Sequence, residues 1–206
     1  MKENYFKICT NYKTQENKGE IIEYVKNFIN ENDEVIIINI GTDRCLGDSV
    51  APIVGTILHE NNCPLKVYGD LDNPIHALNM DDKLEEIYKN HPNAKIIGID
   101  ACLGDKEDIG LIQMRETSIK CGRGVGKVLP HVGNISLIGI VDTSEDFELF
   151  ANKSIRLSLI YNISKLISEI ILMSCDLISK DIKFYNRNKN TYESKGINLE
   201  KEVAIN

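Results

Sequence analysis

The chain has 206 residues, a hydrophobic share of 42% and a formal net charge of −7. That length and apolar share suffice for one sizeable core, and no proline-, serine- or glycine-rich linker divides the sequence, so we expect a single domain over 1–206. The acidic balance argues against a general nucleic-acid binder, because such proteins normally carry a basic face.

The amino-terminal segment and the cysteines indicate the cellular compartment in which the protein is expected. Residues 1–19 lack an apolar h-region and a small-residue cleavage site, and we expect no run that approaches the length of a membrane span. This pattern predicts a cytoplasmic protein with no membrane partner. The cysteines, at positions 9, 45, 63, 102, 121 and 175, show neither CxxC spacing nor the density of a disulfide scaffold. We expect them to be reduced, with Cys102 and Cys175 in the core.

In the first half of the chain, helical and extended patterns alternate. Apolar residues at helical spacing predict a helix over 19–32, and the β-branched run EVIIINI predicts a strand over 34–40 that is covered on both faces. The elements expected next are a helix over 48–62, a short strand over 63–69, a helix over 74–92 and a strand over 95–100. In the helix over 74–92, Leu78, Leu84 and Ile87 are expected to face inward. This βαβαβ order predicts a parallel sheet with helices on its faces.

The second half of the chain breaks this rhythm. The expected elements are a strand within 110–118, a glycine-rich surface loop over 121–134 and a fourth β-branched strand, ISLIGIV, over 135–141. From Asp146 onward, most apolar residues recur every three or four positions, which predicts one long helix or two helices separated near 152–154. The segment 180–206 loses that rhythm and gains Asn, Lys and Glu. We expect it to be a polar, partly mobile tail of the same domain.

Two aspartates stand where α/β proteins place their chemistry. Asp48 lies between the strand EVIIINI and the helix that follows, and Asp100 closes the strand KIIGID. Because ligands bind at the carboxyl ends of parallel strands, both carboxylates are expected beside one crevice. A carboxylate pair can supply both an acid and a base. Local pattern leaves a second interpretation of Asp48 open, in which its side chain only caps the next helix.

Other motifs carry less weight. Asp43 and Arg44 fit a solvated turn, although Asp43 is a third, weaker candidate for the crevice. The segment GRGVG at 122–126 lacks the Walker pattern and the strand-to-helix context of a phosphate loop, so we interpret it as a flexible cover. The histidines lack HExxH spacing, and neither a metal site nor a cofactor is predicted. Cys45 and Cys102 lie near the crevice without a histidine partner, which leaves a thiol peptidase as a minor alternative.

Several segments, taken together, resemble one known family. They are IGTDRCLGDSVAPIVGTIL, VYGDLDNPIHALN, IIGIDACLG, GVGKVLPHVGNISLIGIV and RLSLIYNISKLISEII. Their combination closely resembles the YyaC-type sporulation proteins, over about 34–178. That family is similar to the spore germination protease and, more distantly, to the hydrogenase maturation proteases. The resemblance implies an α/β protein with a three-layer α/β/α sandwich, a mostly parallel sheet and a phosphorylase/hydrolase-like architecture.

The resemblance also assigns roles to single residues. Asp48 in GDSVAP and Asp100 in GIDAC match the aspartates implicated in the peptidase chemistry of the germination protease. In the hydrogenase maturation proteases, the Asp48 position falls on an acid that binds nickel in the substrate. Gly41 and Thr42 stand where that family has Gly-Asn, which makes it the weaker analogy.

Two function hypotheses follow from these residues and this resemblance. The first is a sporulation-associated peptidase, an aspartate-dependent endopeptidase that activates water with Asp48 and Asp100, in which either aspartate could be the acid or the base. Its partner would be a protein or peptide substrate, with spore proteins as the natural analogy. The second is a non-catalytic sporulation factor that binds a peptide, a metal or a protein in the same crevice. Both are compatible with a homo-oligomer.

Overall fold

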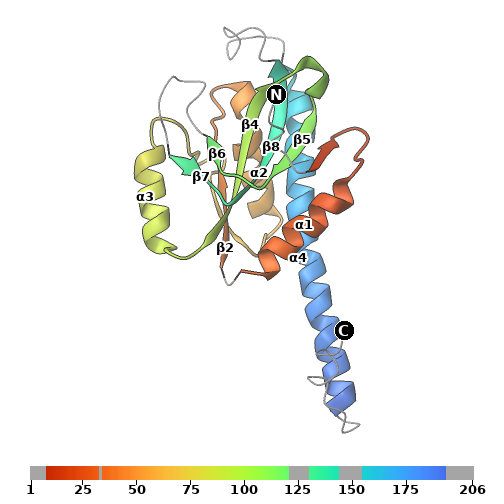
Figure 1. Ribbon diagram of the computed structural model, residues 1–206. Helices are drawn as coiled ribbons and strands as arrows, with labels where there is room; N and C mark the ends of the chain where they lie inside the picture. The colour runs from red at the N-terminus through yellow and green to blue at the C-terminus, as the bar shows by residue number, and fades with distance from the viewer. Residues whose placement is uncertain (1–7, 33, 121–129, 144–154, 194–206) are drawn as a thin grey trace.

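The computed structural model describes residues 8–32, 34–120, 130–143 and 155–193 (Figure 1). Within these residues the main sheet has six strands in the order β1-β5-β8-β4-β2-β3. The strands are β1 (Ile8–Asn11), β2 (Val35–Asn39), β3 (Lys66–Tyr68), β4 (Lys95–Gly104), β5 (Leu111–Arg115) and β8 (Ile135–Thr143). β8, β4, β2 and β3 are parallel neighbours, whereas β5 runs antiparallel to β8 and to β1. The predicted α/β class with a mostly parallel sheet is confirmed.

Helices cover both faces of this sheet (Figure 1). The helices are α1 (Lys18–Asn30), α2 (Val50–Glu60), α3 (Met80–Asn90) and α4 (Leu157–Glu193). α1, α2 and α4 bury their apolar sides in one cluster against the sheet, and α3 contributes to a second cluster on the opposite face. A small antiparallel pair, β6 (Ile119–Lys120) and β7 (His131–Val132), packs beside α3 on that second face. The result is the three-layer arrangement that the resemblance implies.

The central strands explain why the apolar runs are continuous. Side chains alternate between the two faces of a strand, and here both faces are covered by helices. Ile37 of β2 therefore joins the cluster under α1, α2 and α4, while Ile36 and Ile38 join the cluster under α3. Every residue of β2 is buried, as the sequence analysis predicts for EVIIINI.

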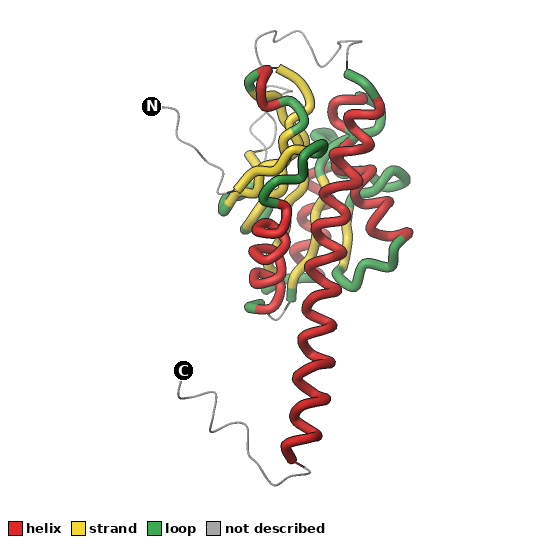
Figure 2. The backbone as a smooth tube through the Cα atoms, turned by 90° about the vertical axis from the view of Figure 1, so that its right-hand side faces the viewer, coloured by secondary structure: helices red, strands yellow, loops and turns green. Residues whose placement is uncertain are grey.

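The long helix α4 runs along the body of the protein and beyond it (Figure 2). Small side chains let it approach its neighbours closely: the Ser164 hydroxyl donates to the Val50 carbonyl of α2 at 3.0 Å, and the Ser174 hydroxyl donates to the Ile22 carbonyl of α1 at 3.0 Å. In the described part of the chain, the Leu157–Lys180 segment of α4 is long and apolar enough to cross a membrane, so the expectation that no run approaches that length is wrong. Half of that window is buried inside the protein, and packing on the sheet accounts for its apolar residues.

Several boundaries differ from the prediction. β1 is an additional strand at the edge of the sheet, and β4 continues past Asp100 to Gly104. α3 begins only at Met80, and Leu78, which was expected to face inward, is 79% exposed. The predicted tail over 180–206 begins inside α4, because the helix runs to Glu193.

Some predictions lie outside the described residues. Most of the glycine-rich loop expected at 121–134 and the break expected near 152–154 belong to this group. Of the cysteines expected in the core, Cys175 is buried and Cys102 is partly buried. The described cysteines, at 9, 45, 63, 102 and 175, are free thiols, as predicted.

Candidate functional site

A glycine turn brings the chain after β2 back toward β4. The Ile40 N–H donates to the Ile99 carbonyl at 2.8 Å, so the end of β2 lies beside the residue that precedes Asp100. Gly41 then adopts a φ of +151°, and a Cβ atom there would lie 2.1 Å from the Asp48 carbonyl oxygen. Only glycine permits that approach. The Thr42 N–H donates to the same carbonyl at 3.0 Å, which fixes Asp48 near the end of β4.

Asp48 does not cap the helix that follows it. It is the last residue of a short 3₁₀ turn, Leu46–Asp48, and the residue before α2 is Ser49. Ser49 makes no side-chain capping bond, and its hydroxyl donates instead to the Leu46 carbonyl at 2.7 Å. The capping interpretation of Asp48 is therefore wrong. Its carboxylate is partly buried, and the Thr42 backbone N–H, which donates to the Asp48 carbonyl, is close enough to favour the charged form of the carboxyl group.

Asp100 lies within β4, on the face of the sheet that α3 covers. Its strand partner is Ile138 of β8, a member of the apolar cluster on that face. One carboxylate oxygen of Asp100 accepts the Ala101 N–H at 2.8 Å. A carboxyl group in such a setting is costly to ionise unless further donors or charges support it.

Burial and mutual repulsion set the proton affinities of the two acids. Burial raises the pKa of Asp48 to about 6, and the Thr42 N–H partly opposes this rise. Burial, and then the charge of Asp48, raise the pKa of Asp100 well above its usual value; the Ala101 N–H and the charge of Arg115 act against the rise. The two carboxyl groups are thus electrostatic neighbours, and the ionised Asp48 makes Asp100 harder to ionise. One carboxylate and one carboxylic acid can coexist here.

Asp43, the third candidate, is not part of this pair. It lies exposed in the loop between Gly41 and Asp48, and none of the interactions described for this loop joins it to either acid. Its neighbour Arg44 is exposed as well, with its backbone N–H donating to the Thr42 hydroxyl at 3.3 Å. This geometry fits the solvated turn that the sequence analysis considered for both residues.

Sequence reasoning missed two polar residues, Gln113 and Arg115, on the same face of the sheet as Asp100. Arg115 of β5 donates from Nε and Nη2 to the Gln113 amide oxygen, and from Nη2 to the Cys102 sulfur at 3.8 Å. The segment LIQMR carries the signal that could have found them, since a glutamine and an arginine alternate with apolar residues in a short strand. Polar groups at alternating positions of a covered strand need partners.

A further acid lies at the carboxyl end of β8. Asp142 accepts the Thr143 N–H on Oδ1 at 2.9 Å, while its buried Oδ2 has no hydrogen-bond partner among the described residues.

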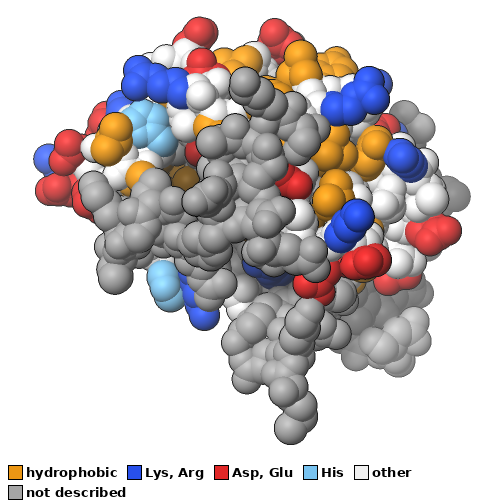
Figure 3. All heavy atoms as spheres, turned by 90° about the horizontal axis from the view of Figure 1, so that it is seen from above, with side chains coloured by type: hydrophobic (Ala, Val, Ile, Leu, Met, Phe, Trp, Pro, Cys, Tyr) orange, Lys and Arg blue, Asp and Glu red, His pale blue; other side chains and the backbone are white. Residues whose placement is uncertain are grey.

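In the part of the chain that the structure describes, no group of three or more histidine, cysteine or acidic side chains is arranged to hold a metal ion. Seen from above, acidic, basic and apolar side chains are mixed around this end of the molecule (Figure 3).

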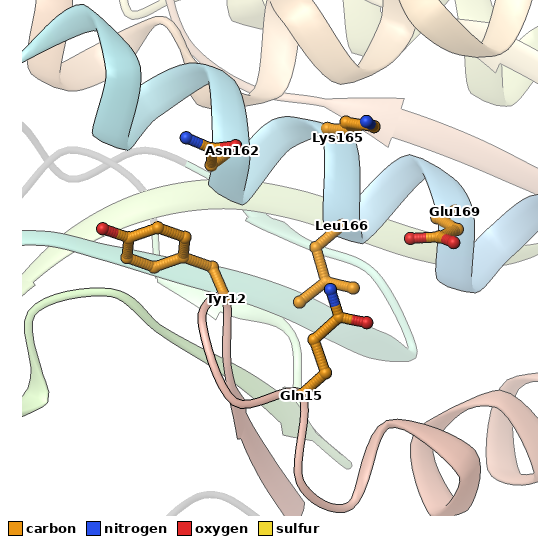
Figure 4. Close-up of a pocket in the computed structure, with 6 residues that line it drawn as sticks. All are labelled: Tyr12, Gln15, Asn162, Lys165, Leu166 and Glu169. Carbon is orange, nitrogen blue, oxygen red and sulfur yellow. The ribbon is translucent and has the colours of Figure 1, made fainter.

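A polar cavity of about 240 Å³ lies between α4 and the segment after β1 (Figure 4). Its lining residues are Tyr12, Gln15, Asn162, Lys165, Leu166 and Glu169. Two of them come from the segment after β1 and four from α4, and neither aspartate of the pair contributes. This cavity is therefore separate from the aspartate pair.

Comparisons with known proteins place the chain among relatives. A family model described as "Protein of unknown function (DUF1256)" matches residues 9–170. "Uncharacterized protein YyaC" of Bacillus subtilis (strain 168) is 40% identical over 136 residues, which are 66% of this chain and 66% of that protein, just under two thirds of its length. Among solved structures, the [NiFe] hydrogenase maturation protease HycI from Thermococcus kodakarensis KOD1 has a TM-score of 0.44 and 14% identity, covering 72% of this chain and 98% of that chain. The resemblance to YyaC-type proteins is confirmed.

Proposed function

The chain belongs to the DUF1256 family, and from that premise we propose that it is a peptidase that hydrolyses a protein substrate through Asp48 and Asp100. The observation that carries this proposal is the unequal pair: two partly desolvated carboxyl groups that influence each other electrostatically, Asp48 in the turn between β2 and α2 and Asp100 in the neighbouring strand β4. Peptide hydrolysis without a cofactor requires a base for water and an acid for the leaving amine, and such a pair supplies both.

The order in which the two acids ionise assigns their roles. Burial raises the pKa of Asp48 to about 6, whereas the pKa of Asp100 is raised well above its usual value by burial and by the charge of the ionised Asp48. Asp48 therefore ionises first and is the base, and Asp100 keeps its proton and is the acid. In the reaction, Asp48 takes a proton from water as the water oxygen bonds to the carbonyl carbon. Asp100 then donates its proton to the amide nitrogen as the carbon–nitrogen bond breaks, and solvent returns the pair to its starting state.

One observation keeps the binding hypothesis as the second candidate. A backbone N–H supports each carboxylate: the Ala101 N–H donates to Asp100 at 2.8 Å, and the Thr42 N–H favours the charged form of Asp48. A non-catalytic sporulation factor would use such tethered carboxylates to bind a peptide, metal or protein. A carboxylate has about four acceptor sites, however, so one amide at each acid leaves capacity for water and substrate.

To test the proposal, the protein is incubated with a panel of candidate protein substrates. Mass spectrometry then detects the new peptide termini that cleavage creates. The resemblance to sporulation proteins makes small spore proteins the first substrates to include. We expect cleavage by the wild type, with a rate that rises through about pH 6 as Asp48 ionises. Asp48→Asn and Asp100→Asn should each lower the rate by about 10²–10⁴-fold, because each keeps the size of the side chain and removes its proton chemistry.

The same assay separates the two candidate functions. A folded variant carrying both Asn substitutions that still cleaves at the wild-type rate would exclude the carboxylate mechanism. No cleavage by the wild type, together with saturable binding of a panel protein that the double variant loses, would replace the peptidase with the binding factor. Circular dichroism of each variant verifies the fold.

A further inference from the structure

The position of Arg115 in the sheet directs its side chain toward the aspartate pair. Arg115 pairs with Ser136 of β8, whereas Asp100 and Gln113 both pair with Ile138, two residues farther along β8. The Arg115 backbone thus lies two residues away from the row that contains Asp100. Its Nη2 atom nevertheless reaches the sulfur of Cys102, two residues beyond Asp100. The side chain therefore runs along the sheet past Ile138, and its guanidinium group lies at the level of Asp100.

Neutral partners hold the guanidinium group in this position. The Gln113 side chain, in a residue only 6% exposed, accepts from Nε and Nη2, and Cys102 accepts from Nη2. These contacts fix the plane of the group, and no acid among the described residues forms an ion pair with it. The Nη1 donors are not used by these contacts.

An arginine is unusual at a partly buried position where no described acid forms an ion pair with it. A charge in a partly desolvated place is expensive unless it is paired, and an apolar side chain would pack on Ile138 at lower cost. The charge is close enough to act on Asp100, yet the two groups do not form an ion pair. A guanidinium group held near a carboxylic acid, but not paired with it, suits a ligand group that is neutral when it arrives and becomes negative during reaction.

We propose that Arg115 forms an anion subsite beside Asp48 and Asp100, and that it binds the carbonyl oxygen of the scissile peptide as that oxygen becomes an oxyanion. The identity of this ligand rests on the proposed peptidase function. As water adds to the carbonyl carbon, the carbon–oxygen π electrons move to the oxygen, and the Nη1 donors stabilise the resulting charge. Collapse of the intermediate returns these electrons as the carbon–nitrogen bond breaks and Asp100 protonates the amine. Donors aimed at developing charge in a water-poor site are a major source of rate enhancement.

Binding of inorganic phosphate tests the subsite without requiring activity. In protein labelled with ¹⁵N-arginine, the Nε–Hε signal of Arg115 is assigned by its loss in Arg115→Gln. Phosphate should shift this signal saturably, and Asp48→Asn should tighten the apparent affinity several-fold because it removes a negative charge near the subsite. The exposed Arg44 should not respond. No saturable shift at Arg115 in either the wild type or Asp48→Asn would overturn the subsite.

Kinetics with a cleaved panel protein tests its role in the reaction. Arg115→Gln should lower kcat by about 10²–10³-fold with a smaller effect on KM, since the contact forms chiefly in the transition state. Arg115→Lys should restore part of kcat, and Arg44→Gln should leave both constants unchanged. Equal kcat for Arg115→Gln and the wild type would overturn the oxyanion role. If the wild type cleaves nothing, the peptidase function fails, and the phosphate titration still decides whether the anion subsite exists.

Discussion

The proton affinity of Asp48 links the stability of the protein to pH. Its pKa in the folded protein is about 6, above the unfolded value of about 3.9. Below about pH 4 the group is protonated in both states; as the pH rises toward 6, the unfolded chain releases the proton first, and stability falls. The contribution is therefore present at low pH and lost as the pH rises through about 6.

Asp48→Asn should abolish this loss. We expect the variant to exceed the wild type in free energy of unfolding by about 1–3 kcal/mol at pH 7 and to differ little at pH 4, since one pKa unit corresponds to about 1.4 kcal/mol. Urea denaturation across this pH range provides the measurement. Asp43→Asn, at an exposed position of the same loop, is the matched control and should show no such trend. A variant that is less stable than the wild type at pH 7 would contradict the burial of an acid at this position.

The sequence predicted part of the site at residue level. Asp48 follows the apolar strand β2 and Asp100 comes after the apolar residues of β4, so their place toward the carboxyl ends of these strands could be inferred from pattern and resemblance, although β4 continues past Asp100 to Gly104. Their electrostatic interaction depends on the close approach of Gly41 to Asp48, which no local pattern encodes. Arg115 reaches the pair from an antiparallel strand whose register with β8 only the tertiary structure reveals.

At the scale of elements, the α2–β3 contact depends on a glycine without a visible signal in the sequence. A Cβ atom on Gly55 of α2 would lie 1.9 Å from the Gly69 carbonyl oxygen and 3.1 Å from the Asn39 amide nitrogen. The nearest atom belongs to the backbone and cannot rotate away. Asn39 itself is fully buried and donates to the Tyr68 carbonyl at 2.9 Å, which joins β2 to the end of β3.

Gly55→Ala should therefore destabilise the protein, even though alanine favours helices. We expect a loss of about 2–3 kcal/mol in free energy of unfolding, typical of overpacking against a rigid neighbour. Gly19→Ala in α1 is the matched control, because nothing lies within 4 Å of a Cβ atom there. That change should be neutral or stabilising by up to about 1 kcal/mol. Equal effects of the two substitutions in urea denaturation would show that helix propensity, and not the approach to Gly69, governs both sites.

Elements with strong periodicity were predictable, whereas those shaped by local side-chain bonds were not. β2 and α2 follow from their apolar runs. α3 was expected to begin near 74, but Asn79 accepts the His76 N–H at 2.9 Å and donates to the Pro74 carbonyl at 3.0 Å. These bonds hold the backbone in a turn that competes with helix formation, so α3 starts only at Met80. β1 was missed because it is a four-residue edge strand defined by its pairing with β5.

At the scale of the whole molecule, the described hydrophobic core takes in only the first part of the long helix α4. The cluster beneath α1, α2 and α4 includes Ile170, Ile171 and Cys175, with Leu177 packed against it. The Ser174 hydroxyl donates to the α1 carbonyl of Ile22 in the same stretch. α4 continues to Glu193, beyond the last residue of this cluster.

A chain that ends at Lys180 should therefore fold like the full chain. We expect its Tm and its cooperativity to match those of the full chain, because all described core residues of α4 remain. A chain that ends at Ser168 lacks Ile170 and Ile171, both fully buried, and the Ser174 bond. Removing buried isoleucines costs about 2–5 kcal/mol each, and a typical domain has only about 5–15 kcal/mol of stability. Near-ultraviolet circular dichroism should thus show the chain that ends at Ser168 to be unfolded at 25 °C. A cooperative unfolding transition in that chain would show that α4 supports the fold through different residues. The same would follow if the chain that ends at Lys180 had no cooperative transition.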